Sequence, residues 1–360
     1  MPEFKGNLSS KMPRSGLSIF AIMSKMAREK NAINLSQGFP DFKSSSALIN
    51  RVHEYMKKDY NQYAPMPGVP NLREAISEKT ESLYNISYEP ENEVTVTSGA
   101  TQAIYTAITA TVKEDDEVVI FTPAYDCYQP AVELNNGKPI FVQLKPPDYT
   151  INWSQVKKVV NRKTKMIIIN TPHNPTGSII NKEDMKELEK LTKNSDILIL
   201  SDEVYEHIIF DGEEHQSVCK FPGLAERSFI VLSFGKTFHN TGWKMGYCLA
   251  PGNLMKEIRK VHQYVVFGSN TPIQYALADH LNENKEDYLG LPEFYQEKRD
   301  FFCNALKNSN FKFEPTPGTY FQLLKYDNIS KEADTDFAKR LIEEKGLASV
   351  PISVFYQRGQ

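Results

Sequence analysis

The stretch KMIIINTPHNPTG, residues 165–177, decides the fold, because a nearly continuous apolar run passes directly into a polar turn. Strands that helices cover on both faces are apolar on nearly every residue, as in parallel sheets. Similar β-rich runs lie at 93–97, 117–121, 139–144, 197–201 and 228–233. Helical periodicity, as at residues 44–60 and 100–112, alternates with these runs. The sequence therefore predicts an α/β fold with a mostly parallel central sheet flanked by helices.

A second, smaller α+β domain is expected beyond about residue 270, where the pattern changes. Amphipathic helical patterns at 271–284, 292–308 and 335–345 are accompanied by weak strand patterns at EPTPGTYFQLL (314–324) and LASVPI (347–352). We therefore expect three parts: residues 1–43 as an N-terminal arm and part of the small domain, 44–270 as the large domain, and 271–360 as the small C-terminal domain.

The composition is that of a folded small-molecule enzyme. The 360 residues are 40% hydrophobic and 24% charged with a net charge of -3, which excludes disorder and provides no field for nucleic acid or an acidic membrane. The apolar runs are too short to cross a bilayer, the N-terminus lacks a secretion signal, and the cysteines show no paired spacing. His173, His207 and His239 lack metal-ligand spacing. We expect a cytoplasmic protein without a metal.

Polar turns follow five of the expected strands, at 98–101, 122–126, 171–177, 202–205 and 234–237. Strand ends of an open parallel sheet meet at one edge, where ligands bind. Taken alone, residues 98–101 suit either a plain helix cap or a phosphate site, and NPTG (174–177) suits a plain turn. Asp202 is more informative, because a carboxylate at the end of a buried strand needs a cationic or hydrogen-bonding partner.

The lysine in Gly235-Lys236-Thr237 does not belong to a P-loop, because Ile230 stands where that motif requires its first glycine. No G-x-G-x-x-G follows the first strands, so a dinucleotide site is also disfavoured. A lysine at a strand end, close to Asp202 and a phosphate-cradling turn, is the set needed to hold an aldehyde cofactor as a Schiff base. Pyridoxal phosphate meets these requirements.

Seven segments carry a family resemblance: GFPDF (38–42), NQYAPMPGVPNLREAI (61–76), TPAYDCY (122–128), NTPHNPTG (170–177), SDEVYEHI (201–208), SFGKTFHNTGWKMGY (233–247) and KVHQYVVF (260–267). From about residue 14 onward the chain resembles the class I pyridoxal-phosphate aminotransferases of fold type I. More narrowly, it resembles the methionine aminotransferase and kynurenine/glutamine transaminase subgroup. The resemblance implies a homodimer that moves an amino group from an amino acid to a 2-oxo acid by a ping-pong mechanism.

The resemblance also implies roles around the cofactor ring. Lys236 would be the Schiff-base lysine and, once free, the proton shuttle. Asp202 would pair with the pyridine nitrogen, Asn174 and Tyr205 would hydrogen-bond the phenolic oxygen, and Tyr125 would lie against the ring face.

The phosphate, by the same resemblance, would be held by Gly99, Ala100, Thr101, Ser233 and Lys244, with Tyr63 reaching it from the neighbouring subunit. Many members of the wider class carry arginine where Lys244 stands, whereas lysine also occurs in the narrower subgroup.

For the substrate, the resemblance places the Gly38 backbone and the Asn174 side chain on the carboxylate. Phe20 and Phe267 would line an apolar side-chain pocket, so apolar or aromatic donors are expected. Thr101 and Gly268 replace bulkier rings of the kynurenine enzymes and favour methionine.

One departure concerns the family's substrate-anchoring arginine, which follows the VPISVFY-like segment. The chain stops at Gln360, and Arg358 comes too early to be that residue, so we expect the chain to be truncated. A β-eliminating carbon-sulfur lyase remains an alternative with the same fold. A non-catalytic ligand-sensing domain is disfavoured, because only about 40 residues precede the catalytic body, too few for a DNA-binding module.

Overall fold

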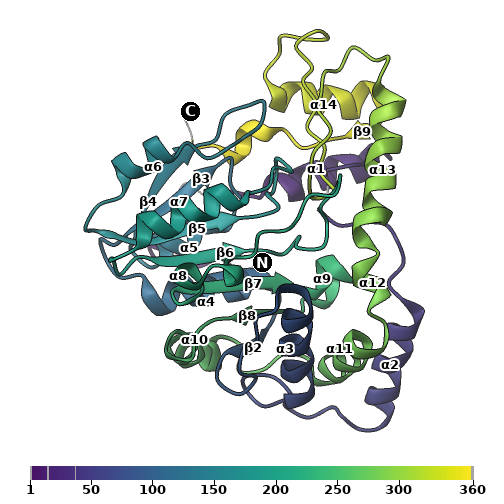
Figure 1. Ribbon diagram of the computed structural model, residues 1–360. Helices are drawn as coiled ribbons and strands as arrows, with labels where there is room; N and C mark the ends of the chain where they lie inside the picture. The colour runs from purple at the N-terminus through teal and green to yellow at the C-terminus, as the bar shows by residue number, and fades with distance from the viewer. Residues whose placement is uncertain (1, 14–15, 37, 358–360) are drawn as a thin grey trace.

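The computed structural model describes residues 2–13, 16–36 and 38–357, and its centre is a seven-stranded sheet (Figure 1). The strands, in the order of the sheet, are β2 (Val94–Thr97), β8 (Gly246–Leu249), β7 (Ser228–Ser233), β6 (Leu198–Asp202), β5 (Thr164–Asn170), β3 (Glu117–Thr122) and β4 (Lys138–Gln143). The pairs from β7 to β4 are parallel, whereas β8 runs antiparallel to both β2 and β7. The predicted α/β class and mostly parallel sheet are confirmed.

The six expected β-rich runs are strands of this sheet, but sequence analysis missed β8. Its four residues, GYCL, lie in the apolar run MGYCLA (245–250), which begins within the segment 233–247 quoted for the family resemblance and contains no β-branched residue. β8 is nevertheless fully buried between β2 and β7. Its antiparallel direction brings Gly246, at its start, to the same sheet edge as Thr97 and Ser233, with which it is paired.

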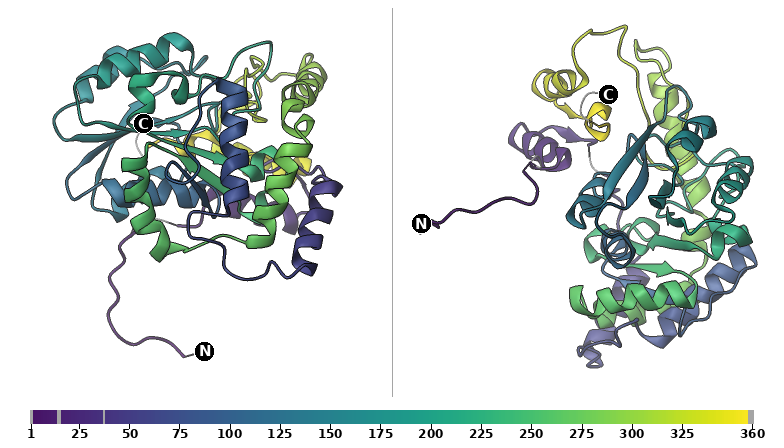
Figure 2. Two further views of the ribbon diagram at one scale, coloured as in Figure 1. Left: turned by 60° about the horizontal axis from the view of Figure 1, so that its bottom comes forward. Right: turned by 90° about the vertical axis from the view of Figure 1, so that its left-hand side faces the viewer.

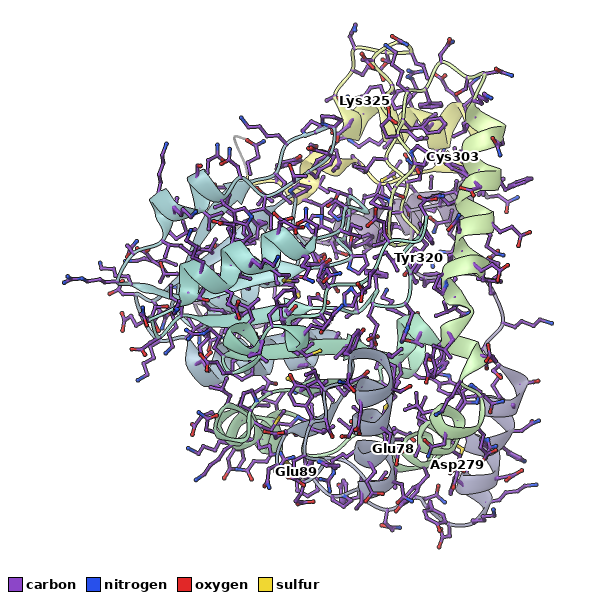
Figure 3. All side chains as sticks on the ribbon, in the orientation of Figure 1. Glu78, Glu89, Asp279, Cys303, Tyr320 and Lys325 are labelled. Atoms are coloured by element: carbon purple, nitrogen blue, oxygen red, sulfur yellow. The ribbon has the colours of Figure 1, made fainter. Side chains whose placement is uncertain are left out.

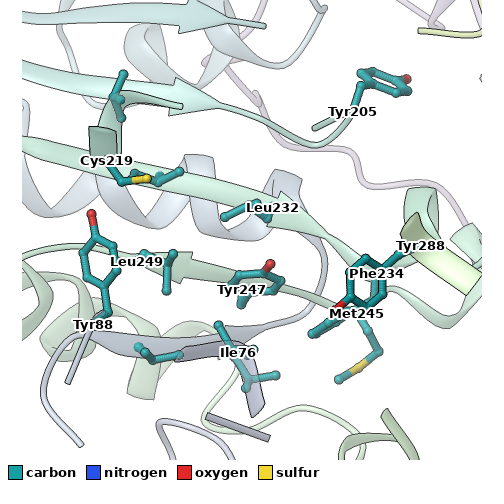
Figure 4. Close-up of a cluster of buried hydrophobic side chains, with 14 of the residues drawn as sticks. Ile76, Tyr88, Tyr205, Cys219, Leu232, Phe234, Met245, Tyr247, Leu249 and Tyr288 are labelled. Atoms are coloured by element: carbon teal, nitrogen blue, oxygen red, sulfur yellow. The ribbon is translucent and has the colours of Figure 1, made fainter. Parts of the chain in front are cut away.

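Apolar side chains of successive strand residues alternate between two packed faces, as the pleat of a strand requires. Val119, Ile167 and Ile199 belong to one core, and Ile120, Ile168 and Leu200 to the other. The second core is covered by α4 (Ala100–Thr111), α5 (Tyr128–Leu134) and α10 (Gly252–Val265). The first is covered by α3 (Pro70–Tyr84), α6 (Trp153–Val159), α7 (Lys182–Thr192), α8 (Pro222–Ala225) and α11 (Thr271–Glu283). Figure 4 shows part of the first core, where Ile76 of α3 lies below Tyr247 and Leu249.

A separate small core joins the beginning and the end of the chain. α1 (Ile19–Glu29) and β1 (Ile33–Asn34) pack with α14 (Asp334–Lys345) and β9 (Leu347–Ala348), and β1 pairs with β9 in parallel. In Figure 1, α14, β9 and α1 lie in the upper right part of the molecule. α12 (Glu286–Leu289) and α13 (Leu291–Leu306) run between this core and the lower part of the molecule.

Contacts across the expected boundary at residue 270 are extensive. α11 begins at Thr271 and packs against α2 (Ser46–Lys57) and α3, which belong to the expected large domain. The division at residues 43 and 270 therefore remains a prediction.

The strand expected at residues 314–324 is wrong. This segment is a loop, with isolated bridges only between Ile209 and Gly318 and between Lys312 and Lys325. Two prolines, Pro315 and Pro317, remove backbone donors that a ladder needs, and Thr319 adopts a positive φ of 60°. The remaining short helices are η1 (Val218–Lys220), α9 (Phe234–Thr237), η2 (Thr241–Trp243) and η3 (Ile352–Phe355).

The segment 2–13 extends away from the body of the molecule in both views of Figure 2. Phe4 and Leu8 of this segment are exposed. No helix in the described ranges is long and apolar enough to span a bilayer.

Candidate active site

An open pocket of about 640 Å³ lies at the carboxyl edge of the sheet, where the polar turns meet. Ten of the residues expected from the sequence line it: Gly99, Ala100, Thr101, Tyr125, Asn174, Asp202, Tyr205, Ser233, Lys236 and Lys244. Nine of them come from the five polar turns or the strand ends that precede them, and Lys244 comes from the segment after η2 (Thr241–Trp243), just before β8.

Lys236 is carried by the short α9, which begins directly after β7. Its Nζ donates to the Gly38 carbonyl oxygen at 2.6 Å and to the Tyr320 hydroxyl oxygen at 3.1 Å. The same Nζ lies 5.5 Å from the centre of the Tyr205 ring. The amine thus joins segments from three distant parts of the chain within one pocket.

Asp202 ends β6, and its residue is only 3% exposed. Burial raises the pKa of the carboxyl group from 3.8 to about 6. The Tyr128 hydroxyl, which donates to Oδ2 at 2.6 Å, and the Val204 N–H, which donates to Oδ1 at 3.3 Å, oppose this rise in pKa. Asp202 is therefore a buried carboxylate whose negative charge a cation in the pocket would stabilise.

Asn170, the last residue of β5, fixes the turn that contains Asn174. Its Nδ2 donates to the Asp202 carbonyl oxygen at 2.9 Å, and its Oδ1 accepts from the Asn174 N–H at 2.7 Å. One amide side chain thereby links two pocket turns. Nearby Tyr205 is buried, and burial raises the pKa of its hydroxyl well above the usual range, so this hydroxyl is a neutral donor at physiological pH.

The other end of the pocket has the features of an anion site. α4 begins there at Ala100, and its cap residue Gly99 has a φ of +76°. A Cβ on Gly99 would lie 3.4 Å from the Lys244 Nζ, so the ammonium group is beside the start of the helix. A Cβ on Gly246 would lie 3.0 Å from the Ala100 nitrogen and 2.7 Å from the Leu232 carbonyl oxygen. Free backbone N–H groups, a helix N-terminus and a lysine together suit a phosphate group.

Phe20, Tyr63 and Phe267 are absent from the described lining of this pocket. Tyr63 is 86% exposed and packs edge to face against Phe267, which is 45% exposed, with ring centres 5.6 Å apart. Phe20 lies in α1 against Phe355. Arg358 lies outside the described residues. The roles expected for Phe20, Tyr63 and Phe267 remain predictions.

Among the polar residues at the site, sequence analysis missed Tyr128, Asn170, Thr241 and Tyr320. Tyr128 belongs to the quoted segment TPAYDCY and is the first residue of α5, so it follows the 122–126 turn directly. Asn170 is a polar residue at the end of an apolar strand, which is the same signal that singled out Asp202. No local signal identifies Thr241 or Tyr320.

The histidines that lack metal-ligand spacing are held by other contacts. His173 Nδ1 lies 2.7 Å from the Thr176 hydroxyl oxygen, and burial lowers the pKa of the ring to about 4. His239 packs against the Phe42 ring. Over the described ranges, no group of three His, Cys, Asp or Glu side chains could hold a metal ion.

The chain is similar to a known protein family and to several of its characterised members. The model of the family "Aminotransferase class I and II" matches residues 30–360. Methionine aminotransferase from Escherichia coli is 47% identical over 346 residues, covering 96% of this chain and 90% of the relative. Kynurenine–oxoglutarate transaminase 1 from Mus musculus is 31% identical, covering 93% and 86%. A solved structure from Escherichia coli, described as having a methionine aminotransferase function, superposes with a TM-score of 0.95 at 45% identity, covering 98% of this chain and 93% of that one.

Proposed function

The chain belongs to the class I and II aminotransferase family, and from that premise we propose its substrates and cofactor. It moves the α-amino group of methionine, or of another apolar or aromatic amino acid, to a 2-oxo acid, with pyridoxal 5'-phosphate as cofactor. The observation that carries this proposal is the shared pocket of the Lys236 amine and the buried Asp202 carboxylate. The similarity to methionine aminotransferase supports the choice of donor.

The pocket residues fit pyridoxal phosphate at three points. The Gly99–Thr101 turn, Ser233 and Lys244 surround a space for its phosphate. Asp202 supplies the negative charge that a protonated ring nitrogen needs, and its pKa of about 6 shows that this charge lacks full compensation without such a partner. Lys236 provides the amine. All pocket residues lie between 99 and 245, which supports the proposal that residues 44–270 form the cofactor-binding domain.

The bound cofactor supplies an aldehyde carbon and a ring that withdraws electrons from the substrate α-carbon. Lys236 would hold that carbon through Nζ and, when its amine is free, move the α-proton of the substrate by general acid–base catalysis. Asp202 would keep the ring nitrogen protonated. The Tyr205 hydroxyl and the Asn174 amide would orient the phenolic oxygen, and Tyr125 would support the ring face.

The substrate carboxylate would be oriented by the Gly38 backbone and the Asn174 side chain. Phe20 and Phe267 would contact an apolar side chain, which favours methionine or an aromatic donor over aspartate.

The four cysteines of the described structure are all free, which supports a reducing compartment such as the cytoplasm.

A homodimer completes this proposal. Tyr63, Tyr264, Val265 and Phe267 expose apolar surface on one chain, and such patches are typical of interaction sites. The segment 2–13, which leaves the body of the molecule with Phe4 exposed (Figure 2), supports an arm that packs on a second copy. Tyr63 would then reach the phosphate in the partner's pocket. Mixing inactive Tyr63→Ala and Lys236→Ala chains tests this arrangement, because mixed dimers would regain part of the activity.

The experiment that tests the proposed function measures amino transfer from methionine, glutamine, phenylalanine, kynurenine and aspartate to a panel of 2-oxo acids. The proposal expects methionine to rank among the fastest donors and aspartate to react poorly. Equal rates for all donors would contradict the substrate assignment. Release of ammonia and pyruvate from a cysteine conjugate, without amino transfer, would instead support the lyase.

A further inference from the structure

Tyr320 contacts the free Lys236 amine, although the proposed chemistry assigns it no role. Its hydroxyl donates to the Gly38 carbonyl oxygen, and the Lys236 Nζ donates to both of these oxygens, at 3.1 Å and 2.6 Å. Tyr320 comes from the loop after α13, between that helix and the sheet in Figure 3. Gly38, Lys236 and Tyr320 thus form a closed triangle of hydrogen bonds between three segments.

The direction of these hydrogen bonds determines which state of the amine they fit. The Gly38 carbonyl can only accept, and the hydroxyl proton of Tyr320 is already used on that carbonyl. Both oxygens therefore accept N–H bonds from Nζ, and a free amine has at least two to offer. A lysine nitrogen joined to the carbon of an aldehyde has lost those N–H bonds. The two oxygens therefore suit the free amine of Lys236, and they do not suit its nitrogen when it is bonded to the cofactor carbon.

The Tyr320 ring is held in place independently of this hydroxyl. Its ring centre lies 5.3 Å from that of Tyr205, 5.7 Å from that of Tyr295 and 5.0 Å from that of Phe321. The neighbouring Thr319 N–H donates to the Ile208 carbonyl at 2.9 Å, which anchors the loop beside the Tyr205 turn. The hydroxyl is thus presented to Lys236 by packed surroundings.

We propose that the Tyr320 hydroxyl and the Gly38 carbonyl are the holding place of the Lys236 amine whenever that amine is free of the cofactor. Tyr320 is then a positioning residue, which keeps the amine within the pocket for proton transfer. This inference rests on the proposed function. It implies that Tyr320 stabilises the pyridoxamine phosphate form of the enzyme, in which Lys236 is free, more than the pyridoxal phosphate form.

The test compares two cofactor affinities in wild type and in Tyr320→Phe, which keeps the ring and its packing. Equilibrium titration of the full-length protein with pyridoxal phosphate and pyridoxamine phosphate gives the ratio of the two dissociation constants. Loss of a hydrogen bond to a charged group should weaken pyridoxamine phosphate binding about tenfold relative to pyridoxal phosphate binding. Steady-state kinetics should show a lower kcat for methionine with little change in KM.

Tyr295→Phe is the matched control, because its hydroxyl is buried, lies in the same aromatic cluster and has no hydrogen-bond partner among the described residues. It should leave the ratio unchanged. An unchanged ratio in Tyr320→Phe, or an equal change in Tyr295→Phe, would overturn the inference while leaving the proposed function intact. Wild-type protein that binds neither compound would overturn both.

Discussion

Replacement of Asp202 by asparagine should stabilise the cofactor-free protein and lower the activity of the cofactor-loaded enzyme about a thousandfold. Burial raises the pKa of Asp202 from 3.8 to about 6, so the folded state binds the carboxyl proton more tightly than the unfolded chain does. A difference of about two pKa units corresponds to about 3 kcal/mol of lost stability at neutral pH. The cost is complete above pH 6 and absent below pH 4, because the carboxyl group is then protonated in both states.

Asparagine removes the charge, and its single amide oxygen still accepts the Tyr128 hydroxyl hydrogen bond, whereas the longer hydrogen bond from the Val204 N–H is lost. Urea unfolding of the cofactor-free protein should show a gain of up to about 3 kcal/mol for Asp202→Asn at pH 7.5, falling toward zero near pH 4. Activity should change in the opposite direction. A charge pair at about 4 Å and an effective dielectric near 20 is worth about 4 kcal/mol, or roughly three orders of magnitude in rate.

Glu203→Gln is the matched control. The Glu203 carboxylate is equally buried, but Ser201, His215 and the Val218 N–H are its hydrogen-bond partners, at 2.7, 2.9 and 3.1 Å. Its replacement should destabilise the protein by about 1–3 kcal/mol. A loss of stability for Asp202→Asn that is equal at pH 7.5 and pH 4 would refute the reasoning from burial.

Three further substitutions test neighbouring contacts. Tyr128→Phe removes a hydrogen-bond donor to Asp202 and therefore raises the pKa of that carboxyl group further above 6. Affinity for pyridoxal phosphate, measured by titration at several pH values, should then begin to fall at a higher pH than in the wild type. Gly246→Ala places a Cβ 2.7 Å from a backbone oxygen, and calorimetry should show a lower Tm together with weakened cofactor binding. Lys79→Met removes the ammonium group from the buried Glu206 carboxylate, which then keeps only the Tyr84 hydroxyl and the His207 ring as partners, and urea unfolding should show a loss of about 3 kcal/mol. The first prediction is contradicted if Tyr128→Phe leaves the pH dependence of pyridoxal phosphate affinity unchanged. The others are contradicted if Gly246→Ala leaves Tm unchanged, or if Lys79→Met leaves the free energy of unfolding unchanged.

The sheet and the convergence of its turns could be predicted because both follow from short-range patterns. The apolar runs of β5, β6 and β7 identify buried strands, and the parallel order places Asp202 and Lys236 at one edge. β8 is as short as β2, four residues each, but it lacks the β-branched residues that mark β2 as a strand. The loop at 314–324 has the aromatic and aliphatic composition of a strand, but Pro315 and Pro317 interrupt its hydrogen bonding.

Contacts between residues far apart in the chain could not be predicted. The hydroxyl of Tyr320 meets a carbonyl 282 residues earlier, and no local sequence pattern encodes that approach. The Tyr128–Asp202 contact spans 74 residues and depends on how α5 packs against β3 and β4. The roles of Tyr63 and Phe267 were expected from the family resemblance alone. Both side chains are exposed in the single chain, so its structure does not test these roles.

The most direct test of the central claim is borohydride reduction of the full-length protein loaded with pyridoxal phosphate, followed by digestion and mass spectrometry. The account predicts that the reduced cofactor is attached to Lys236, and that Lys236→Arg loses the label. Lys244 is an internal comparison, because its ammonium group lines the same pocket. A label on Lys244 or on another lysine, with Lys236 unmodified, would contradict the account.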